Sequence, residues 1–164
     1  MTCLFCMENS PVHNKIEYPP MHTAEHLLNA TMGKLFGCTR SRNSHIERKK
    51  GKCDYTLPFP PTGEQIQAIE DAVNTVINLD LPVTMEYMPY EQASLIADLG
   101  KLPPSANDLV RIVRIGPYDT CACIGLHVEH TAQVGIFSIT SYDYDPSNQR
   151  LRLRFKLSDT DWQD

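Results

Sequence analysis

Two short motifs, far apart in the chain, carry the side chains that bind transition metals. His22 and His26 stand four residues apart, and Cys123 and His127 repeat that spacing near the other end. Two imidazoles at positions i and i+4 of a helix can reach one metal ion, and a thiolate together with imidazoles suits Zn²⁺. These residues therefore predict one zinc site. A catalytic zinc usually keeps a position for water, so either one of the four is a weak ligand or the ion expands to five ligands.

The helical half of this site has other interpretations. Two exposed histidines can share a helix by chance. A helical zinc protease has glutamate directly after its first histidine, whereas Glu25 comes third, so that class is excluded. At about 100° per residue the histidines share one side of the helix, and we expect them to face a cleft or solvent. The opposite, anchoring side carries four apolar residues: Ala24, Leu27, Leu28 and Leu35.

Hydrophobic periodicity and turn residues predict the elements that position these ligands. Expected helices begin close after the 18–21 segment and end near residue 36, open at 62–65, and cover 90–99. Expected strands are the hairpin 44–57, the segments 83–88 and 109–115, and a last hairpin of 135–144 and 149–157. In that last strand arginines alternate with apolar residues. This order predicts an α+β class with a mostly antiparallel sheet packed with helices. We expect an irregular lead-in at 1–18 and a single domain at 19–164.

Composition narrows the class of protein. The 164 residues are 41% hydrophobic and 21% charged, as in ordinary globular domains. No apolar run reaches membrane-span length, and the first ten residues show no secretory pattern, so we expect a cytoplasmic protein without membrane association. In a reducing cytosol the six cysteines point to metal or redox chemistry rather than disulfides. The net charge of −5 argues against non-specific coating of nucleic acid but permits a local basic patch.

Longer matches surround the two motifs. Residues 21–28 read MHTAEHLL and residues 119–128 read DTCACIGLHV. These stretches resemble the editing domain of alanyl-tRNA synthetase and the related AlaX trans-editing proteins. Further matches lie at 44–46, 54–55, 111–116 and 131–135, so the likeness spans about residues 18–145. Editing domains of threonyl-tRNA synthetase share the same metal frame.

The resemblance implies a fold like those editing domains, with His22, His26, Cys123 and His127 as zinc ligands. It implies a hydrolase that deacylates mischarged tRNA in trans, Ser- or Gly-tRNA-Ala, with the metal orienting the substrate or polarising a bound water. The partner would be the aminoacylated acceptor end of tRNA. By the same resemblance His45 and Asp54 lie near the zinc cleft as candidate catalytic residues. A solvated face is the usual explanation for basic clusters, but here one is a candidate for tRNA phosphates: Arg40, Arg42, Arg48, Lys49, Lys50 and Lys52.

The metal loop departs from the family pattern. Ile124 and Leu126 stand where the family has glycine and threonine, so the wall beside the metal becomes apolar. Two other functions therefore stay open, a zinc- and tRNA-binding module without catalysis and a zinc hydrolase of small esters. The chain has no room for an aminoacylation core, so we expect no synthetase activity. Three alternatives stay open from the sequence. Cys3 and Cys6 could bind a second metal, Cys121 could be a further ligand, and the protein could be a monomer or a dimer.

Overall fold

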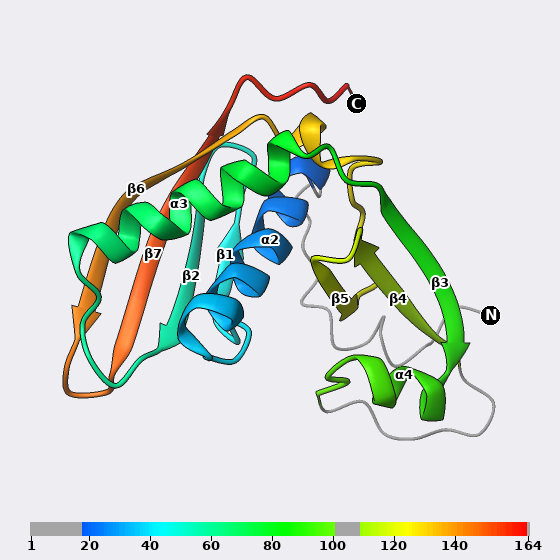
Figure 1. Cartoon of the computed structure of the whole chain (residues 1–164), viewed down its shortest axis with the longest axis horizontal. Helices are drawn as coiled ribbons and strands as arrows, with labels where there is room; N and C mark the ends of the chain where they lie inside the picture. The colour runs from blue at the N-terminus through cyan, green and yellow to red at the C-terminus, as the bar shows by residue number, and fades with distance from the viewer. Residues whose placement is uncertain (1–17, 101–108, 164) are drawn as a thin grey trace.

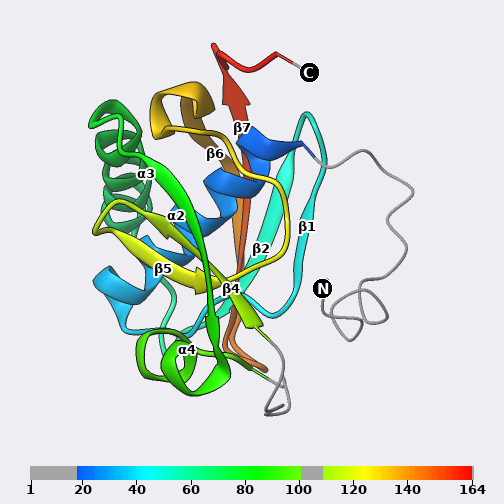
Figure 2. The same cartoon turned by 90° about the vertical axis from the view of Figure 1, so that its right-hand side faces the viewer.

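The computed structural model describes residues 18–100 and 109–163. Figures 1 and 2 show helices and antiparallel strands arranged around a central helix. In chain order the elements are α2 (Pro19–Phe36), β1 (Ser44–Ile46), β2 (Gly51–Thr56), α3 (Gly63–Asn78), β3 (Val83–Pro89), α4 (Tyr90–Ile96), β4 (Leu109–Ile115), β5 (Asp119–Ala122), the 3₁₀ helix η1 (Thr131–Val134), β6 (Ile136–Asp145) and β7 (Arg150–Ser158). Within these residues no helix has the length and apolar character to cross a membrane. Apart from Tyr18, the predicted lead-in lies outside the described residues, as do Cys3 and Cys6.

The larger sheet has four antiparallel strands in the order β1-β2-β7-β6. Along β7, the apolar residues Leu151, Leu153 and Phe155 are fully buried and the arginines between them are not. Successive side chains of a strand point to opposite faces, so the apolar face lies under α2 and α3 and the arginines line the other face. The half-buried strand predicted from the alternation is confirmed.

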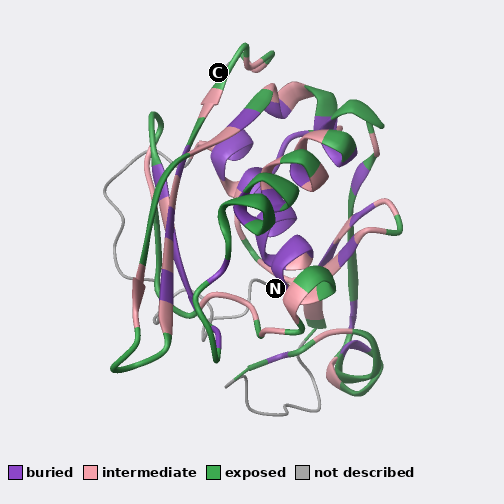
Figure 3. Cartoon of the chain, turned by 60° about the vertical axis from the view of Figure 1, so that its left-hand side comes forward, coloured by how far each residue is buried: buried purple, intermediate pink, exposed green. Residues whose placement is uncertain are grey.

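Helix α2 is buried on nearly every side (Figure 3). Prolines occupy its first turn, where their missing N–H and fixed φ cost the helix nothing. Gly37 ends it with φ 68°, a left-handed conformation that glycine adopts freely, and its N–H donates to the Gly33 carbonyl. Leu27, Leu28 and other apolar residues pack the helix against α3 and β2 on one side and β5 on the other. Helix α2 is therefore the middle layer of the molecule.

Helix α3 starts at a capping box. The Thr62 hydroxyl accepts from the Gln65 N–H at 3.1 Å, and the Gln65 side chain accepts from the Thr62 N–H at 2.9 Å. The residues predicted to form its apolar stripe, among them Ile69 and Val73, are buried against α2 and the larger sheet. This helix closes the core over the larger sheet.

The smaller sheet has the order β3-β4-β5 and holds the second half of the metal motif. Val113 and Ile115 of β4 belong to the main core, next to α2. Ile112, on the opposite face, packs with Met88 and with Ala93 of α4 in a separate small core. Because β5 pairs with β4 and also contacts α2, the end of β5 is held beside the helix that carries the two histidines.

The predicted α+β class and its antiparallel sheets are confirmed, and several details differ. Helix α4 ends at Ile96 instead of Leu99, because Ala97 already has an extended backbone. Residues 119–122 form β5, a strand that was not predicted because its sequence lacks an alternation of apolar and polar residues. The expected split of the α2 surface is wrong at two positions: His26 is only 4% exposed, whereas Leu35 is 49% exposed. The smaller sheet covers the histidine side of α2, and the last turn of the helix extends beyond the core.

Gly135→Ala should lower the free energy of unfolding by about 2–3 kcal/mol. Gly135 has φ 87°, and a Cβ there would lie 2.3 Å from the Ser158 carbonyl oxygen, which is backbone and cannot rotate away. Gly63→Ala is the matched control, because a Cβ at Gly63 meets no atom within 4 Å. Urea unfolding of both variants measures the effect. Equal midpoints for the two variants would contradict the described close approach of chain 158–160 to Gly135.

Candidate metal centre

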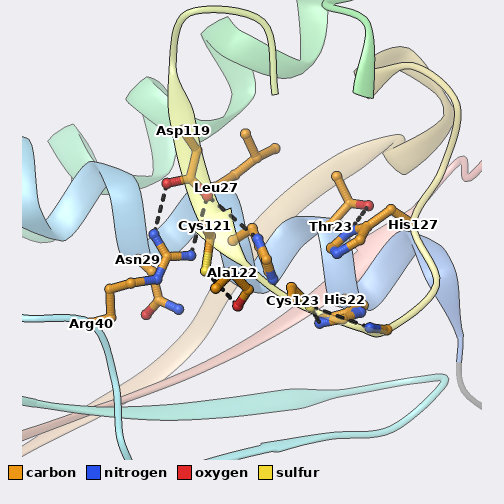
Figure 4. Close-up of polar contacts among 12 residues, drawn as sticks. His22, Thr23, Leu27, Asn29, Arg40, Asp119, Cys121, Ala122, Cys123 and His127 are labelled. Atoms are coloured by element: carbon orange, nitrogen blue, oxygen red, sulfur yellow. Dashed lines mark hydrogen bonds and ion pairs between the residues drawn. The ribbon is translucent and has the colours of Figure 1, made fainter. Parts of the chain in front are cut away.

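The four predicted ligands form one group. His22 and His26 lie one turn apart on α2, Cys123 directly follows β5, and His127 lies in the loop that leads to η1 (Figure 4). One possible ligand atom from each residue lies within 4.8 Å of all the others. Residues from opposite ends of the chain therefore surround a single point, as a metal ion requires.

The spacing inside this group suits zinc. Sγ of Cys123 lies 3.4 Å from Nε2 of His22. With Zn–S at about 2.3 Å and Zn–N at about 2.0–2.1 Å, a sulfur and a nitrogen bound at a tetrahedral angle are about 3.6 Å apart. The imidazole of His127 stacks on that of His22, with ring centroids 4.1 Å apart, and the ring of His26 meets both edge-on. Small shifts bring the donors to tetrahedral positions.

Two of the histidines are oriented by hydrogen bonds on Nδ1. His22 Nδ1–H donates to the Leu126 carbonyl at 3.0 Å. His127 Nδ1 lies 3.0 Å from the Thr23 hydroxyl, which also accepts from the Val128 N–H at 3.2 Å. A proton on Nδ1 in each ring leaves the lone pair of Nε2 directed at the metal group. Such outer contacts fix the tautomer and the ring plane of metal-binding histidines.

A carboxylate and an arginine stand behind the third histidine. Asp119 Oδ2 lies 3.4 Å from His26 Nδ1, an ion-pair contact longer than a good hydrogen bond. Arg40 donates hydrogen bonds to the same carboxylate from both terminal nitrogens, at 2.7 and 3.2 Å. Asp119 is buried, and although burial raises the pKa of its carboxyl, His26 and Arg40 lower that pKa below the ordinary value. Asp119 is therefore ionised and directs Nε2 of His26 towards the metal group.

The electrostatics of the group favour a thiolate beside neutral imidazole. Burial by itself raises the pKa of the Cys123 thiol, but the close imidazoles of His127, His22 and His26 outweigh burial and lower that pKa to about 2. Burial lowers the pKa of His127 to about 4. For His26, burial acts downward but Asp119 and Cys123 raise the pKa above its usual value. Near neutral pH the group thus holds a thiolate and an unprotonated His127, the forms that bind metal, whereas the raised pKa of His26 makes its binding to a metal more sensitive to acid.

Two buried ring nitrogens of the group form no hydrogen bond with the described residues, and one of them, Nδ1 of His26, faces Asp119. Nε2 of His127 has no hydrogen-bond partner among the described residues, although it is shielded from solvent. A buried imidazole nitrogen without a partner is costly. A zinc ion among the four donors would satisfy it, so the residues present fit the metal that the sequence predicts.

The loop between Cys123 and His127 is held from outside the group. Arg111 of β4 donates from Nη1 to the Gly125 carbonyl at 2.9 Å, and the Gly125 N–H donates to Cys123 Sγ at 3.4 Å. The two apolar residues of the loop point outward: Ile124 is 51% exposed and Leu126 is 57% exposed. Both side chains are therefore accessible at the surface, and the apolar wall beside the metal stays a prediction.

The two candidate catalytic residues belong to the larger sheet, whereas the four ligands belong to α2 and to the segment after β5. His45 of β1 is half exposed and its Nε2 contacts Glu47 at 3.0 Å. The Asp54 carboxylate of β2 accepts two hydrogen bonds from Arg152, at 2.8 and 2.9 Å, and one from Asn43. Arg152 and Asn43 lower the pKa of Asp54 below its ordinary value. The catalytic role of both residues stays a prediction.

The members of the predicted basic cluster lie in different surroundings. Arg40 is bound to Asp119, and the guanidinium of Arg48 lies over the ring of Tyr18, 4.6 Å from its centroid. Arg42 is exposed beside the loop after α2, and the three lysines lie at or next to the β1–β2 turn: Lys49, Lys50 and Lys52. Their contact with tRNA also stays a prediction.

The remaining cysteines and His130 stand outside the metal group. Cys121 is partly buried next to it, and burial raises the pKa of its thiol to about 12, so it is a poor ligand at neutral pH. Cys53 is in the core, and Cys38 is half buried with its thiol donating to the Met32 carbonyl at 3.4 Å. His130 contacts Asp80 at the surface.

Two residues that position the ligands had no signal strong enough to be picked out. Asp119 opens the same short stretch as Cys123, and Thr23 follows the first histidine directly. An acid or hydroxyl next to a metal motif is a known outer-shell pattern. The long-range pairing of Arg40 with Asp119, by contrast, depends on β5 lying against α2, and short-range sequence patterns do not contain that contact.

Comparison with known proteins agrees with this geometry. The profile of the family described as the threonyl and alanyl tRNA synthetase second additional domain matches residues 110–152, which include Cys123 and His127. The chain is 35% identical over 137 residues to an alanine–tRNA ligase of Treponema denticola, an alignment that covers 83% of the chain and 23% of the relative.

Two further alanine–tRNA ligases show the same relationship. The protein of Pseudothermotoga lettingae is 31% identical and that of Coxiella burnetii 32% identical, each over 121 residues that make up 73% of the chain and 14% of the relative. The chain therefore spans less than a quarter of the length of these relatives.

Asp119→Asn should weaken zinc binding by about 10–100-fold, because an amide cannot supply the charge that orients His26. Competition with a chromogenic chelator measures the affinity. Asp143→Asn, which removes a carboxylate paired with Arg154 on the larger sheet, is the matched control and should leave it unchanged. Equal zinc affinities for the two variants would show that Asp119 does not position the ligand.

In metal-free protein, Cys123 should be alkylated by iodoacetamide at a rate that hardly changes between pH 5 and 8. Its pKa of about 2 keeps it a thiolate over that whole range, whereas an ordinary thiol loses reactive thiolate about tenfold per unit below its pKa of about 8.5. Cys121, with a pKa of about 12, should react slowly and faster as pH rises. Peptide mapping separates the sites. A Cys123 rate that climbs like that of a free thiol, or one that added zinc fails to suppress, would contradict the described group.

Proposed function

The chain belongs to the alanyl-tRNA synthetase-related editing-domain family, and on this premise we propose that it is a zinc-dependent hydrolase of mischarged tRNA. The bond cleaved is the ester between a wrongly attached amino acid and the 3′ end of tRNA-Ala. Serine and glycine are the proposed amino acids. The ligase activity named for the full-length relatives is not part of the proposal, since the chain matches less than a quarter of each.

The observation that carries the proposal is the four-residue ligand group at the positions of the family motif. His22, His26, Cys123 and His127 would hold the zinc ion. A zinc ion bound there supplies a Lewis acid for an ester carbonyl or an activated water. A binding site for small amino acids discriminates poorly in synthesis, which is the reason that a separate hydrolytic site is useful.

The chain's own residues would restrict what reaches that group. Arg111 holds the Gly125 carbonyl and so fixes the loop that forms one wall of the site. Ile124 and Leu126 present apolar side chains next to the ligands, so the acyl group would lie against a surface without a hydroxyl. The acidic outer partner, Asp119, stays turned inward on His26 and Arg40 and is not available to substrate.

A zinc- and tRNA-binding module without catalysis is the second candidate function. It is favoured by the same two side chains, Ile124 and Leu126, which replace the residues usual beside the metal in this family. Such a module would bind one zinc ion and tRNA and leave the ester intact.

Purified, zinc-loaded protein should release serine or glycine from mischarged tRNA-Ala. Chelation, or Cys123→Ala, should reduce release to the uncatalysed rate, because chelation removes the metal and the variant removes one of its four ligands. Cys38→Ala, which removes a thiol outside the ligand group, is the matched control and should keep full activity. Tight zinc and tRNA binding with no release from either substrate would favour the binding module and contradict the hydrolase.

A further inference from the structure

A cavity of about 300 Å³ lies where the segment after α2 meets β2 and the β6–β7 turn. We call it the arginine pocket. Its polar lining includes Arg40, Arg42, Asn43, Thr56, Asn148 and Arg150. None of the four metal ligands lines it, so it is a separate feature from the metal centre.

Two of the charges around the arginine pocket are already neutralised. Arg40 is bound by both terminal nitrogens to Asp119. The carboxylate of Asp54, the acid that lines the pocket, is held by Arg152 and Asn43. Arg42 and Arg150 form no ion pair with any described residue. Arg150 also interacts with Asp54 and Asp145 at longer range. The pocket therefore carries two guanidinium groups without a close ion-pair partner, in a protein whose net charge is −5.

Arg150 differs from the other two arginines of its strand, because each of those forms an ion pair with an aspartate. Arg150, Arg152 and Arg154 project from alternate positions on one face of β7. Arg152 binds Asp54 on the neighbouring strand, and Arg154 binds Asp143 at 2.6 Å. Register places Asp145 opposite Arg150.

Asp145 does not pair with Arg150, however. Its carboxylate accepts from the hydroxyl and the N–H of Ser147 within the β6–β7 turn, at 2.6 and 3.0 Å. Nε of Arg150 is buried and has no hydrogen-bond partner among the described residues. A buried donor without an acceptor is destabilising. Arg150 therefore lacks the acceptor that both of its neighbours on the strand have.

We propose that the arginine pocket binds a phosphate of the tRNA acceptor arm through Arg42 and Arg150. The inference rests on the proposed function, since it assigns the contact that would hold the same substrate. Guanidinium groups bind phosphate oxygens in pairs of hydrogen bonds, and the cavity has room for a phosphate with its sugar. Asn148 accepts from the Arg150 N–H through Oδ1, which leaves its amide nitrogen to donate to the same ligand.

The position of Arg40 connects the pocket with the metal centre. Arg40 lines the cavity, and its guanidinium contacts Asp119, which in turn contacts His26. In Figure 4, Arg40 lies beside one part of α2, near Asn29, and the ligands Cys123 and His127 lie beside the part that carries His22. A strand whose 3′ ester lies at the metal can therefore extend along α2 and place an upstream phosphate at Arg42 and Arg150. The lysines of the β1–β2 turn are not needed for this contact.

The test measures how an uncharged RNA hairpin that reproduces the acceptor stem binds to zinc-loaded protein over a range of salt concentrations. Each arginine that contacts a phosphate contributes about tenfold in affinity. Arg42→Gln with Arg150→Gln should therefore weaken binding by about a hundredfold, and should reduce the slope of log affinity against log salt by about 0.7–0.9, because one phosphate contact is lost. Arg42→Lys with Arg150→Lys keeps the charges and should retain most of the slope.

Lys156→Gln is the matched control, because it removes one exposed charge from β7 outside the pocket. It should change the slope by less than a third of the double variant. Zinc content and circular dichroism show that the variants are folded. Unchanged hairpin binding in the double glutamine variant would overturn the inference. A double variant that no longer binds inorganic phosphate but still binds the hairpin as tightly as the unchanged protein would overturn it too.

Binding and catalysis fail separately in this design. Because the hairpin carries no amino acid, its binding does not depend on deacylation. A protein that binds it through the arginine pocket and cleaves no ester refutes the hydrolase and keeps this inference. Conversely, if mischarged tRNA is cleaved, the double variant should raise KM for tRNA and leave kcat unchanged.

Discussion

The burial of α2 between two sheets is the constraint on which the rest of the structure depends. A metal ion needs its donors within a few ångströms of one point, and here they come from opposite ends of the chain. Leu27 and Leu28 anchor the helix in the core of the larger sheet, while β5 covers the side with the histidines. The packing that excludes water from the core is thus the same packing that brings Cys123 and His127 to the helix.

Preorganisation of the ligands follows from that placement. Thr23 and the Leu126 carbonyl set the rings of His127 and His22, and Asp119 sets His26. All three contacts cross from α2 to the segment 119–127, so they are present only when the two halves are packed together. Stabilisation of the Cys123 thiolate by the imidazoles depends on the same proximity. Folding and metal binding are therefore expected to reinforce one another.

The sequence predicted the features that depend on local pattern and on family motifs. The limits of α2, the alternating β7 strand, the antiparallel α+β class and the relationship to alanyl-tRNA synthetase are confirmed. The burial of His26 was missed, because helical periodicity shows which side is apolar but not whether a second sheet covers the polar side. The Arg40–Asp119 pair was missed for a similar reason. A cluster of basic residues is usually exposed to solvent, and only tertiary packing shows that Arg40 is bound to a carboxylate. Hydrolysis, its substrate and tRNA contact remain proposals.

The measurement that tests the central claim most directly is X-ray absorption at the zinc edge, combined with metal analysis of the purified chain. One zinc ion per chain should be found, with one sulfur at about 2.3 Å and nitrogen neighbours at about 2.0–2.1 Å. Cys123→Ala should remove the sulfur shell, whereas Cys121→Ala should leave it in place. A chain that binds no zinc, or a shell with two or more sulfurs, would contradict a centre built from three histidines and Cys123.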